Sequence, residues 1–291
     1  MVGGEHERAV AGRSHLEFAL VPDPSAYAER VGPFLLADEL VHNLALGIIA
    51  HARPDGILAL VEGGGSVQCA AVMVTPRNLV ISRSPTVGAL GVMARGLHGA
   101  GIALPGVVGP AAEALAFARA WRVTTLQPAH RTTAMQLYQA DTALLPAQRA
   151  PGAVRPAREG DIDLVAGWIT AFNLEALPDA AHDPAAARRM AEDHIGRGCL
   201  WLWEDTEPVA MTAVGGSTPH GARVYAVYTP PGHRRRGYAS TLVAEVTRQL
   251  LASGKQWACL FTDLMNPTTN HIYQEIGYRP VVAFDDYRFG A

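Results

Sequence analysis

The residues best suited to chemistry lie in one glycine- and arginine-rich turn, residues 229–240, which reads TPPGHRRRGYAS. A run of β-branched and aromatic residues precedes the turn, and this composition is typical of a buried strand. Apolar residues at helical spacing follow it, and Gly254 stands where a left-handed cap would end that helix. The first N–H groups of a helix lack intrahelical partners and carry partial positive charge. The turn is therefore predicted to bind a phosphate or pyrophosphate group.

The side chains of the turn narrow the kind of anion. Gly237 and Ala239 are small enough to let phosphate oxygens approach the backbone, and three consecutive arginines add positive charge. The nucleotide loop GxxxxGK[ST] and the dinucleotide loop GxGxxG do not occur in the chain. The pattern RxxGxA, formed by Arg234, Gly237 and Ala239, resembles the acyl-coenzyme A signature RxxGxG/A of the GNAT superfamily of N-acetyltransferases.

A second segment, residues 263–280, strengthens this resemblance. It reads DLMNPTTNHIYQEIGYRP, and it is similar to a family segment in which an asparagine opens a helix and a tyrosine follows two turns later. Asn266 and Tyr273 occupy these two places, and Gly277 and Tyr278 match the glycine-aromatic pair that comes next. The organisation of the chain resembles that of tandem-domain bacterial members of the superfamily.

The resemblance implies that acetyl-coenzyme A is the cosubstrate, with its pantetheine arm along the strand end and its pyrophosphate in the turn. Two alternatives stay open: the arginines can be solvated turn residues, and Asn266 can be a plain helix cap in front of Pro267. The residues that the resemblance assigns to the cofactor are Val227, Tyr228, Thr229, Arg234, Arg235, Arg236, Gly237, Tyr238, Ala239, Ser240 and Asn266.

The resemblance also implies catalytic roles. Tyr273 matches the general acid that protonates the departing thiolate, although a tyrosine packed against the sheet is the alternative. A backbone N–H near Val227 would stabilise the oxyanion. The attacking amine must lose a proton, because a lysine-like amine has a pKa near 10.4. Glu175 and Asp263 are the candidate bases, and exposed carboxylates that only solvate the surface are the alternative for both.

The composition excludes several other classes of protein. A net charge of −3 and a pI of about 6.4 do not favour a nucleic-acid partner. Three widely spaced cysteines, Cys69, Cys199 and Cys259, form neither a metal-binding pair nor a disulfide framework, and no HExxH motif is present. The polar start of the chain and the lack of a long apolar run predict neither a signal peptide nor a membrane span. We therefore expect a cytoplasmic protein without a metal or a membrane partner.

The order of predicted elements indicates two domains of the α/β class, each with a mixed sheet and helices on both faces. A proline-rich break at residues 146–152 separates a first domain, 1–148, from a second, 152–291. The second domain carries both motifs. The first has a similar order of strands and helices, but it reads ISRSPTVGALGVM where the pyrophosphate turn should lie. We interpret it as a degenerate copy of the GNAT fold that lacks the pyrophosphate loop; an unrelated α/β domain is the alternative.

These inferences predict an N-acetyltransferase that transfers an acetyl group directly to an amine. The acceptor is a small-molecule or peptide amine that the sequence does not identify. The loop 179–183, with Asp179 and Asp183 at its ends, is compatible with a cationic acceptor, and an ordinary solvated loop is the alternative. A homodimer is compatible with the resemblance. The competing hypothesis is a non-catalytic protein that binds or senses acyl-coenzyme A.

Overall fold

The order of secondary structure elements is the same in the two halves of the chain. The computed structural model describes residues 15–51, 56–176 and 183–290, so residues 1–14 of the predicted first domain and the acidic residues 179–182 lie outside the described residues. The first half contains β1 (Leu16–Leu20), α1 (Pro24–Leu36), α2 (Asn43–Ile49), β2 (Ile57–Gly63), β3 (Ser66–Met73), β4 (Leu79–Ile81), α3 (Val87–Gly99), β5 (Gly106–Pro110), α4 (Ala111–Thr125) and β6 (Ala129–Ala140).

The second half repeats this order, strand, helix, helix, three strands, helix, strand, helix, strand, with two short 3₁₀ turns added. It contains β7 (Ala153–Pro156), η1 (Glu159–Asp161), α5 (Ile162–Ala176), α6 (Pro184–Gly196), β8 (Leu200–Asp205), β9 (Glu207–Gly215), β10 (Gly221–Tyr228), η2 (Pro231–His233), α7 (Tyr238–Ala252), β11 (Trp257–Asp263), α8 (Pro267–Glu275) and β12 (Arg279–Phe289). The predicted mixed α/β class is confirmed.

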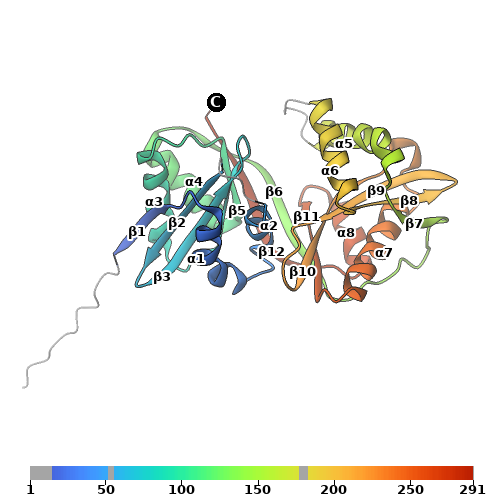
Figure 1. Ribbon diagram of the computed structural model, residues 1–291, viewed down its shortest axis with the longest axis horizontal. Helices are drawn as coiled ribbons and strands as arrows, with labels where there is room; N and C mark the ends of the chain where they lie inside the picture. Colours follow the sequence, from blue (N-terminus) through green and yellow to red (C-terminus); the bar gives the residue numbers. More distant parts are fainter. Residues whose placement is uncertain (1–14, 52–55, 177–182, 291) are drawn as a thin grey trace, which may run out of the picture.

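One mixed sheet of 12 strands runs through both halves, in the order β1-β2-β3-β4-β5-β12-β6-β11-β10-β9-β8-β7. Helices cover both faces in each half (Figure 1). In the first half, α3 and α4 bury one face and α1 and α2 bury the other. In the second half, α7 and α8 cover one face, and α5 and α6 cover the other. The sheet is therefore apolar on both sides, as expected for a layered α/β fold.

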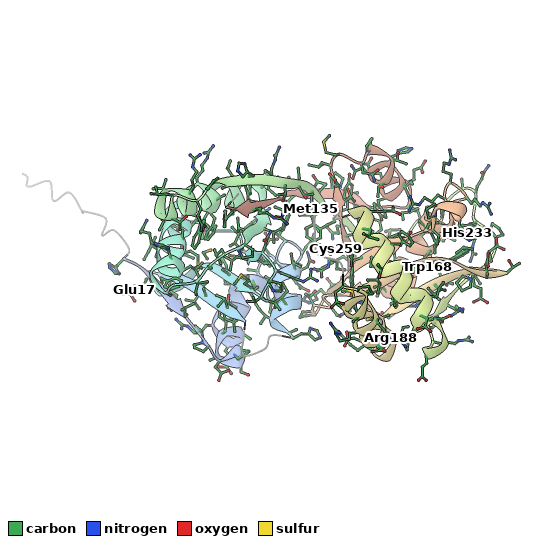
Figure 2. The ribbon with its side chains drawn as sticks, turned by 90° about the horizontal axis from the view of Figure 1, so that it is seen from above. Glu17, Met135, Trp168, Arg188, His233 and Cys259 are labelled. Carbon is green, nitrogen blue, oxygen red and sulfur yellow. The ribbon has the colours of Figure 1, made fainter. Side chains whose placement is uncertain are left out.

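The last strand of each half lies beside the other half. β6 pairs with β11 along its length, from Ala140 opposite Ala258 to Met135 opposite Asp263. β12 pairs with β5 at its far end and with β6 throughout. Met135 and Cys259, near the middle of the molecule in Figure 2, belong to the apolar cluster formed around these exchanged strands. The predicted division at residues 148–152 is thus crossed by strand pairing, and it stays a prediction.

The seam between the halves explains why polar residues interrupt an apolar stretch around the first two helices. Residues 35–50 are apolar but interrupted by polar residues. Two of these are buried against the second half: a Glu39 carboxylate oxygen accepts a 2.8 Å bond from the His220 N–H, and Asn43 Oδ1 accepts a 3.1 Å bond from Arg223. Glu39 and Asn43 are thus interface residues whose partners lie far along the chain.

Candidate functional site

The sheet opens at the carboxyl end of β10. β10 and β11 pair in parallel only from Gly221 opposite Trp257 to Arg223 opposite Cys259. On the other side, the ladder with β9 breaks between Tyr225 and Tyr228. Ala226, inside this bulge, has a φ of 51°. Residues 226 and 227 therefore have no register partner in β9, and the backbone of the strand end is left for another partner.

Beyond the strand, the turn has the backbone geometry of an anion-binding nest. Arg235 has a φ of 62° and Gly237 a φ of 77°, so left-handed residues alternate along the turn. The first N–H of α7 that bonds within the helix region is that of Thr241, which donates to Gly237 O at 3.0 Å. The N–H groups of residues 238–240 precede this bond. Successive N–H groups in such a turn, at the start of a helix of 15 residues, favour a phosphate group.

Gly237 is required by backbone conformation rather than by crowding. An added Cβ would come no closer than 3.9 Å to Gln148 O. The φ of 77°, however, costs an L-residue roughly 1–2 kcal/mol. The site therefore has room for oxygen atoms beside Gly237, which fits the role that the motif implies.

Two buried side-chain atoms near this turn have no hydrogen-bond partner within the described residues. They are the Thr229 hydroxyl at the end of β10 and Nδ1 of His233 in η2. A buried polar atom without a partner costs about 1–3 kcal/mol. A ligand with amide groups along the strand end would offer the Thr229 hydroxyl a partner. Thr229 and the nest together fit a molecule that has a pantetheine arm and a pyrophosphate.

Arg234 makes its contacts with the protein itself. Its Nε donates to Thr229 O at 2.8 Å, and one terminal nitrogen lies 2.7 Å from both carboxylate oxygens of Glu175. The guanidinium also lies over the Tyr228 ring, 5.7 Å from its centre. This pairing raises the pKa of Arg234. The signature arginine thus connects the end of α5 with the end of β10, while Arg235 and Arg236 are exposed.

The two tyrosines assigned to the cofactor have buried side chains. Tyr228 is 6% exposed and packs against Trp168, and burial and the Glu175 carboxylate raise its pKa. Tyr238 is 4% exposed and its hydroxyl donates to Asp205. The backbone groups of both residues remain suited to a ligand. The hydroxyl of Ser240 donates to Gly237 O at 2.9 Å. Val227 packs partly against the core under α7, and Ala239 is half-buried.

The residues at the start of α8 have local partners. Asn266 caps the helix, because its Oδ1 accepts a 3.1 Å bond from the Thr269 N–H, which is the capping alternative raised above. Asp263 Oδ1 accepts a 2.8 Å bond from the Met265 N–H. Asp263 is therefore the exposed last residue of β11, with one side-chain oxygen engaged by the backbone of the turn that follows.

Tyr273 lies in the core of the second half. It is 7% exposed and its ring meets that of Tyr278 edge-on, with 5.9 Å between the ring centres. Burial raises its pKa, so the phenol stays protonated at physiological pH. A protonated phenol is the form that a general acid needs. The two residues of the second motif therefore have different places on α8. Asn266 caps the start of the helix, and Tyr273 lies on its buried face.

The site thus brings Glu175, Tyr228, Thr229 and Arg234 into direct contact, and it leaves Asp263 apart from that group. The sequence did not indicate the bulge at Ala226, because alanine is not a residue that signals a left-handed conformation. It also gave no sign that Arg234 would pair with Glu175.

In the first half, a carboxylate faces the turn that corresponds to the nest. The Ser84 N–H donates to Glu113 Oε1 at 3.4 Å, and the Ser84 hydroxyl donates to Thr86 O at 2.8 Å. A negative charge at this place disfavours a phosphate. Within residues 15–51, 56–176 and 183–290, no group of three metal-binding side chains comes together, and no helix has the length and apolar character to span a bilayer.

Comparisons with known proteins agree with this architecture. The family model described as FR47-like protein matches residues 205–288. A GCN5-related N-acetyltransferase from Sphaerobacter thermophilus has a similar structure, with 14% identity, a TM-score of 0.61 and coverage of 95% of this chain and 97% of that one. A GNAT-family acetyltransferase from Colwellia psychrerythraea has 11% identity and a TM-score of 0.58, with coverage of 94% and 98%.

A tandem GNAT protein from the clavulanic acid biosynthesis pathway has 15% identity and a TM-score of 0.57, again with coverage of 94% and 98%. No curated protein is significantly similar to the chain in sequence. At these identities the structures establish the fold, and they do so over both halves of the chain. The resemblance is therefore confirmed at the level of the fold: the chain has the GNAT acyltransferase fold.

Proposed function

We propose that the chain is an acetyl-coenzyme A dependent N-acetyltransferase whose second half binds the cosubstrate and transfers the acetyl group directly to an amine. The observation that carries the proposal is the junction of β10 and α7. There the unpaired strand end, the buried Thr229 hydroxyl and the nest of N–H groups follow one another along the chain. A ligand with an amide-bearing arm and a pyrophosphate matches this sequence of groups.

The residues of the strand end would hold the arm, and the N–H groups of residues 235–240 would hold the pyrophosphate. Acetyl-coenzyme A supplies the acetyl group as an activated thioester. A backbone N–H in the bulge at residues 226–227 would donate to the carbonyl oxygen on which negative charge develops. Tyr273 would donate its proton to the leaving sulfur. The Tyr273 phenol has the protonated, neutral form that this role requires.

Of the two candidate bases, we favour Glu175. It lies beside the end of β10 through its contacts with Arg234 and Tyr228, whereas Asp263 is engaged in a turn before α8. The Glu175 carboxylate would accept the proton of the attacking amine, directly or through a water molecule. The acceptor is an amine of a small molecule or a peptide.

A specific observation favours the second candidate function, acyl-coenzyme A binding without catalysis. Each of the three side chains assigned to chemistry has a structural partner or environment: Glu175 is ion-paired, Asp263 holds a turn and Tyr273 is packed in the core. Such a protein would bind acetyl-coenzyme A but release no free thiol with any amine.

The deciding experiment compares glycines at the two ends of α7. Gly237 and Gly254 both have positive φ, 77° and 97°, and neither has close neighbours where a Cβ would be added. Gly237→Glu places a carboxylate in the nest, and we expect it to weaken acetyl-coenzyme A binding by about 100-fold or more, because like charges repel strongly there. Gly254→Glu carries a similar backbone penalty and should bind normally.

Binding is measured by calorimetry, and turnover by thiol release across a panel of amines. Equal affinity of the two variants would overturn the cosubstrate site. Normal binding by the wild type with no thiol release from any amine would favour the non-catalytic protein.

A further inference from the structure

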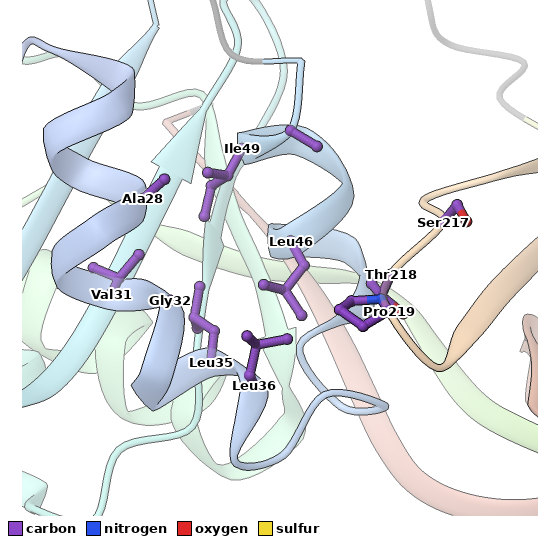
Figure 3. Close-up of a pocket in the computed structure, with 11 residues that line it drawn as sticks. Ala28, Val31, Gly32, Leu35, Leu36, Leu46, Ile49, Ser217, Thr218 and Pro219 are labelled. Carbon is purple, nitrogen blue, oxygen red and sulfur yellow. The ribbon is translucent and has the colours of Figure 1, made fainter. Parts of the chain in front are cut away.

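A cavity lies at the seam between the halves, outside the proposed acetyltransferase site. Its volume is about 260 Å³. Two helices of the first half form most of its wall, with Val31 and Leu35 on α1 and Leu46 and Ile49 on α2, and the turn between β9 and β10 closes the opposite side with Pro219 (Figure 3). The cavity therefore exists only where the two halves meet.

Gly32 keeps this cavity open. It lies inside α1, directly before Pro33, and lines the cavity, and a Cβ added to it would meet no atom within 4 Å outside its chain neighbours and the backbone of the helix. Glycine inside a helix costs about 1 kcal/mol relative to alanine. Pro33 follows at once, and a proline ring crowds a Cβ on the residue before it, so glycine suits the local backbone of α1. The absence of a side chain at residue 32 also leaves the space of the cavity unfilled.

The buried polar groups at the cavity already have partners within the protein. The N–H and hydroxyl of Thr218 both donate to Gly221 O, at 2.9 and 3.3 Å, and Thr218 O accepts a 2.7 Å bond from Lys255. The nearby buried charge, Glu39, is paired with His220. A ligand would therefore find largely apolar walls without a free charge, with the exposed Ser217 at their edge, which favours a neutral apolar molecule.

The size of the cavity sets the size of the ligand. An apolar cavity of about 150 Å³ binds benzene. The larger volume here suits a molecule with two rings. The N-terminal residues 1–14 are a poor occupant chemically, because they read MVGGEHERAVAGRS and contain no aromatic or large aliphatic side chain beyond Met1 and two valines. Leu36, which is 42% exposed at this cavity, adds apolar surface for a ligand.

From these observations we infer that the cavity between α1, α2 and residues 217–219 is a binding site for a small, neutral, apolar molecule with one or two rings. Because both halves contribute walls, the bound molecule would stabilise their docking. This site is independent of the proposed acetyltransferase activity.

The test uses two substitutions at Gly32 with the full chain. Gly32→Leu fills the cavity, and Gly32→Ala is the matched control, because both add a Cβ before Pro33 but only leucine takes up the space. The fluorescent two-ring probe 1-aminonaphthalene is titrated into each protein, and indole is the competitor. We expect saturable binding by the wild type and Gly32→Ala, displacement by indole, and at least tenfold weaker binding by Gly32→Leu. Indole should raise the Tm of the first two proteins and leave that of Gly32→Leu unchanged.

Three results would overturn the inference. One is the absence of saturable probe binding by the wild type, and another is equal binding by Gly32→Leu. The third is that another occupant is found: a variant lacking residues 1–14 that binds the probe when the full chain does not, or a concentration-dependent dimer that Gly32→Leu or Leu36→Glu dissociates. Acetyl-coenzyme A affinity, measured alongside, should be the same in all Gly32 variants.

Discussion

Arg234 and Glu175 form a two-pronged ion pair, with one guanidinium nitrogen 2.7 Å from each carboxylate oxygen. The pair joins Glu175, in the last turn of α5, to Arg234, the first of the three consecutive arginines in the turn. Both side chains are partly exposed, 41% and 48%, so the pair itself contributes little to stability, on the order of 0–1 kcal/mol. Its importance is positional, because it places a carboxylate beside the end of β10.

Substituting the two carboxylates distinguishes their roles. Glu175→Gln removes the proposed base while retaining a side chain that can still bond to Arg234, and we expect kcat to fall at least tenfold, within the range typical of general-base catalysis, with little change in acetyl-coenzyme A affinity. Asp263→Asn retains an oxygen for the Met265 N–H and should leave kcat within about twofold. Thiol-release kinetics measure both; a larger loss in Asp263→Asn would reverse the assignment.

Removing one hydroxyl at a time separates the two neighbouring tyrosines. Tyr273→Phe should lower kcat about tenfold or more and leave acetyl-coenzyme A binding unchanged, because the phenol acts only on the leaving group. The control is Tyr278→Phe. Its hydroxyl shares a 2.7 Å bond with the buried Thr247, so its loss should cost stability, roughly 1–3 kcal/mol, and spare kcat. If Tyr273→Phe turned over normally, Tyr273 would be a packing residue.

Two buried histidines should make the protein less stable in mild acid. In His42 and His194, Nδ1 donates to a backbone carbonyl, so Nε2 must accept, from the Arg83 N–H and the Tyr225 hydroxyl respectively. Burial lowers the pKa of both rings. The unfolded chain takes up protons below pH of about 6.5 that the folded chain refuses, so stability is lost as the pH falls from there to the lowered folded pKa values.

Thermal melts between pH 7.5 and 5 measure this effect. We expect the Tm to decrease as the pH falls from about 6.5, and the decrease to be shallower in His42→Gln, which cannot take up a proton. A Tm that is constant over this range would mean that the rings are protonated in the folded protein as readily as in the unfolded chain.

The strand exchange predicts that the second half does not fold well alone. A fragment of residues 152–291 lacks β6, so β11 and β12 both lose their neighbour. A fragment of residues 129–291 includes β6 and should unfold more cooperatively and at a higher temperature, as measured by circular dichroism. Equal melting of the two fragments would show that β6 is dispensable for the second half.

The elements with strong local patterns were predictable. The strand at residues 223–229 and the helix beyond it correspond to β10 and α7, and Gly254, with a φ of 97°, has the left-handed conformation expected at the end of that helix. α4 ends at Thr125, where Leu126 has a φ of 62° and Pro128 follows soon after; leucine gives no signal of such a left-handed residue. The boundaries of such helices depend on geometry that composition does not fix.

What the sequence could not provide are contacts between distant residues. The exchange of β6 and β12 leaves no local signal, since each strand has ordinary strand composition. The same holds for the site. The turn was recognisable from its glycine and arginines, but the pairing of Arg234 with Glu175, 59 positions earlier, depends on how α5 packs beside β10. The open strand end arises from a bulge at Ala226, and alanine gives no signal of a left-handed backbone conformation.

The exchanged strands also set an order of events during synthesis. β5 is made well before residues 284–288, the segment that covers its outer edge. Until then the growing chain carries an unpaired strand edge, which is a surface prone to association with other chains. The first half can therefore reach its final form only when residues 284–288 have been made.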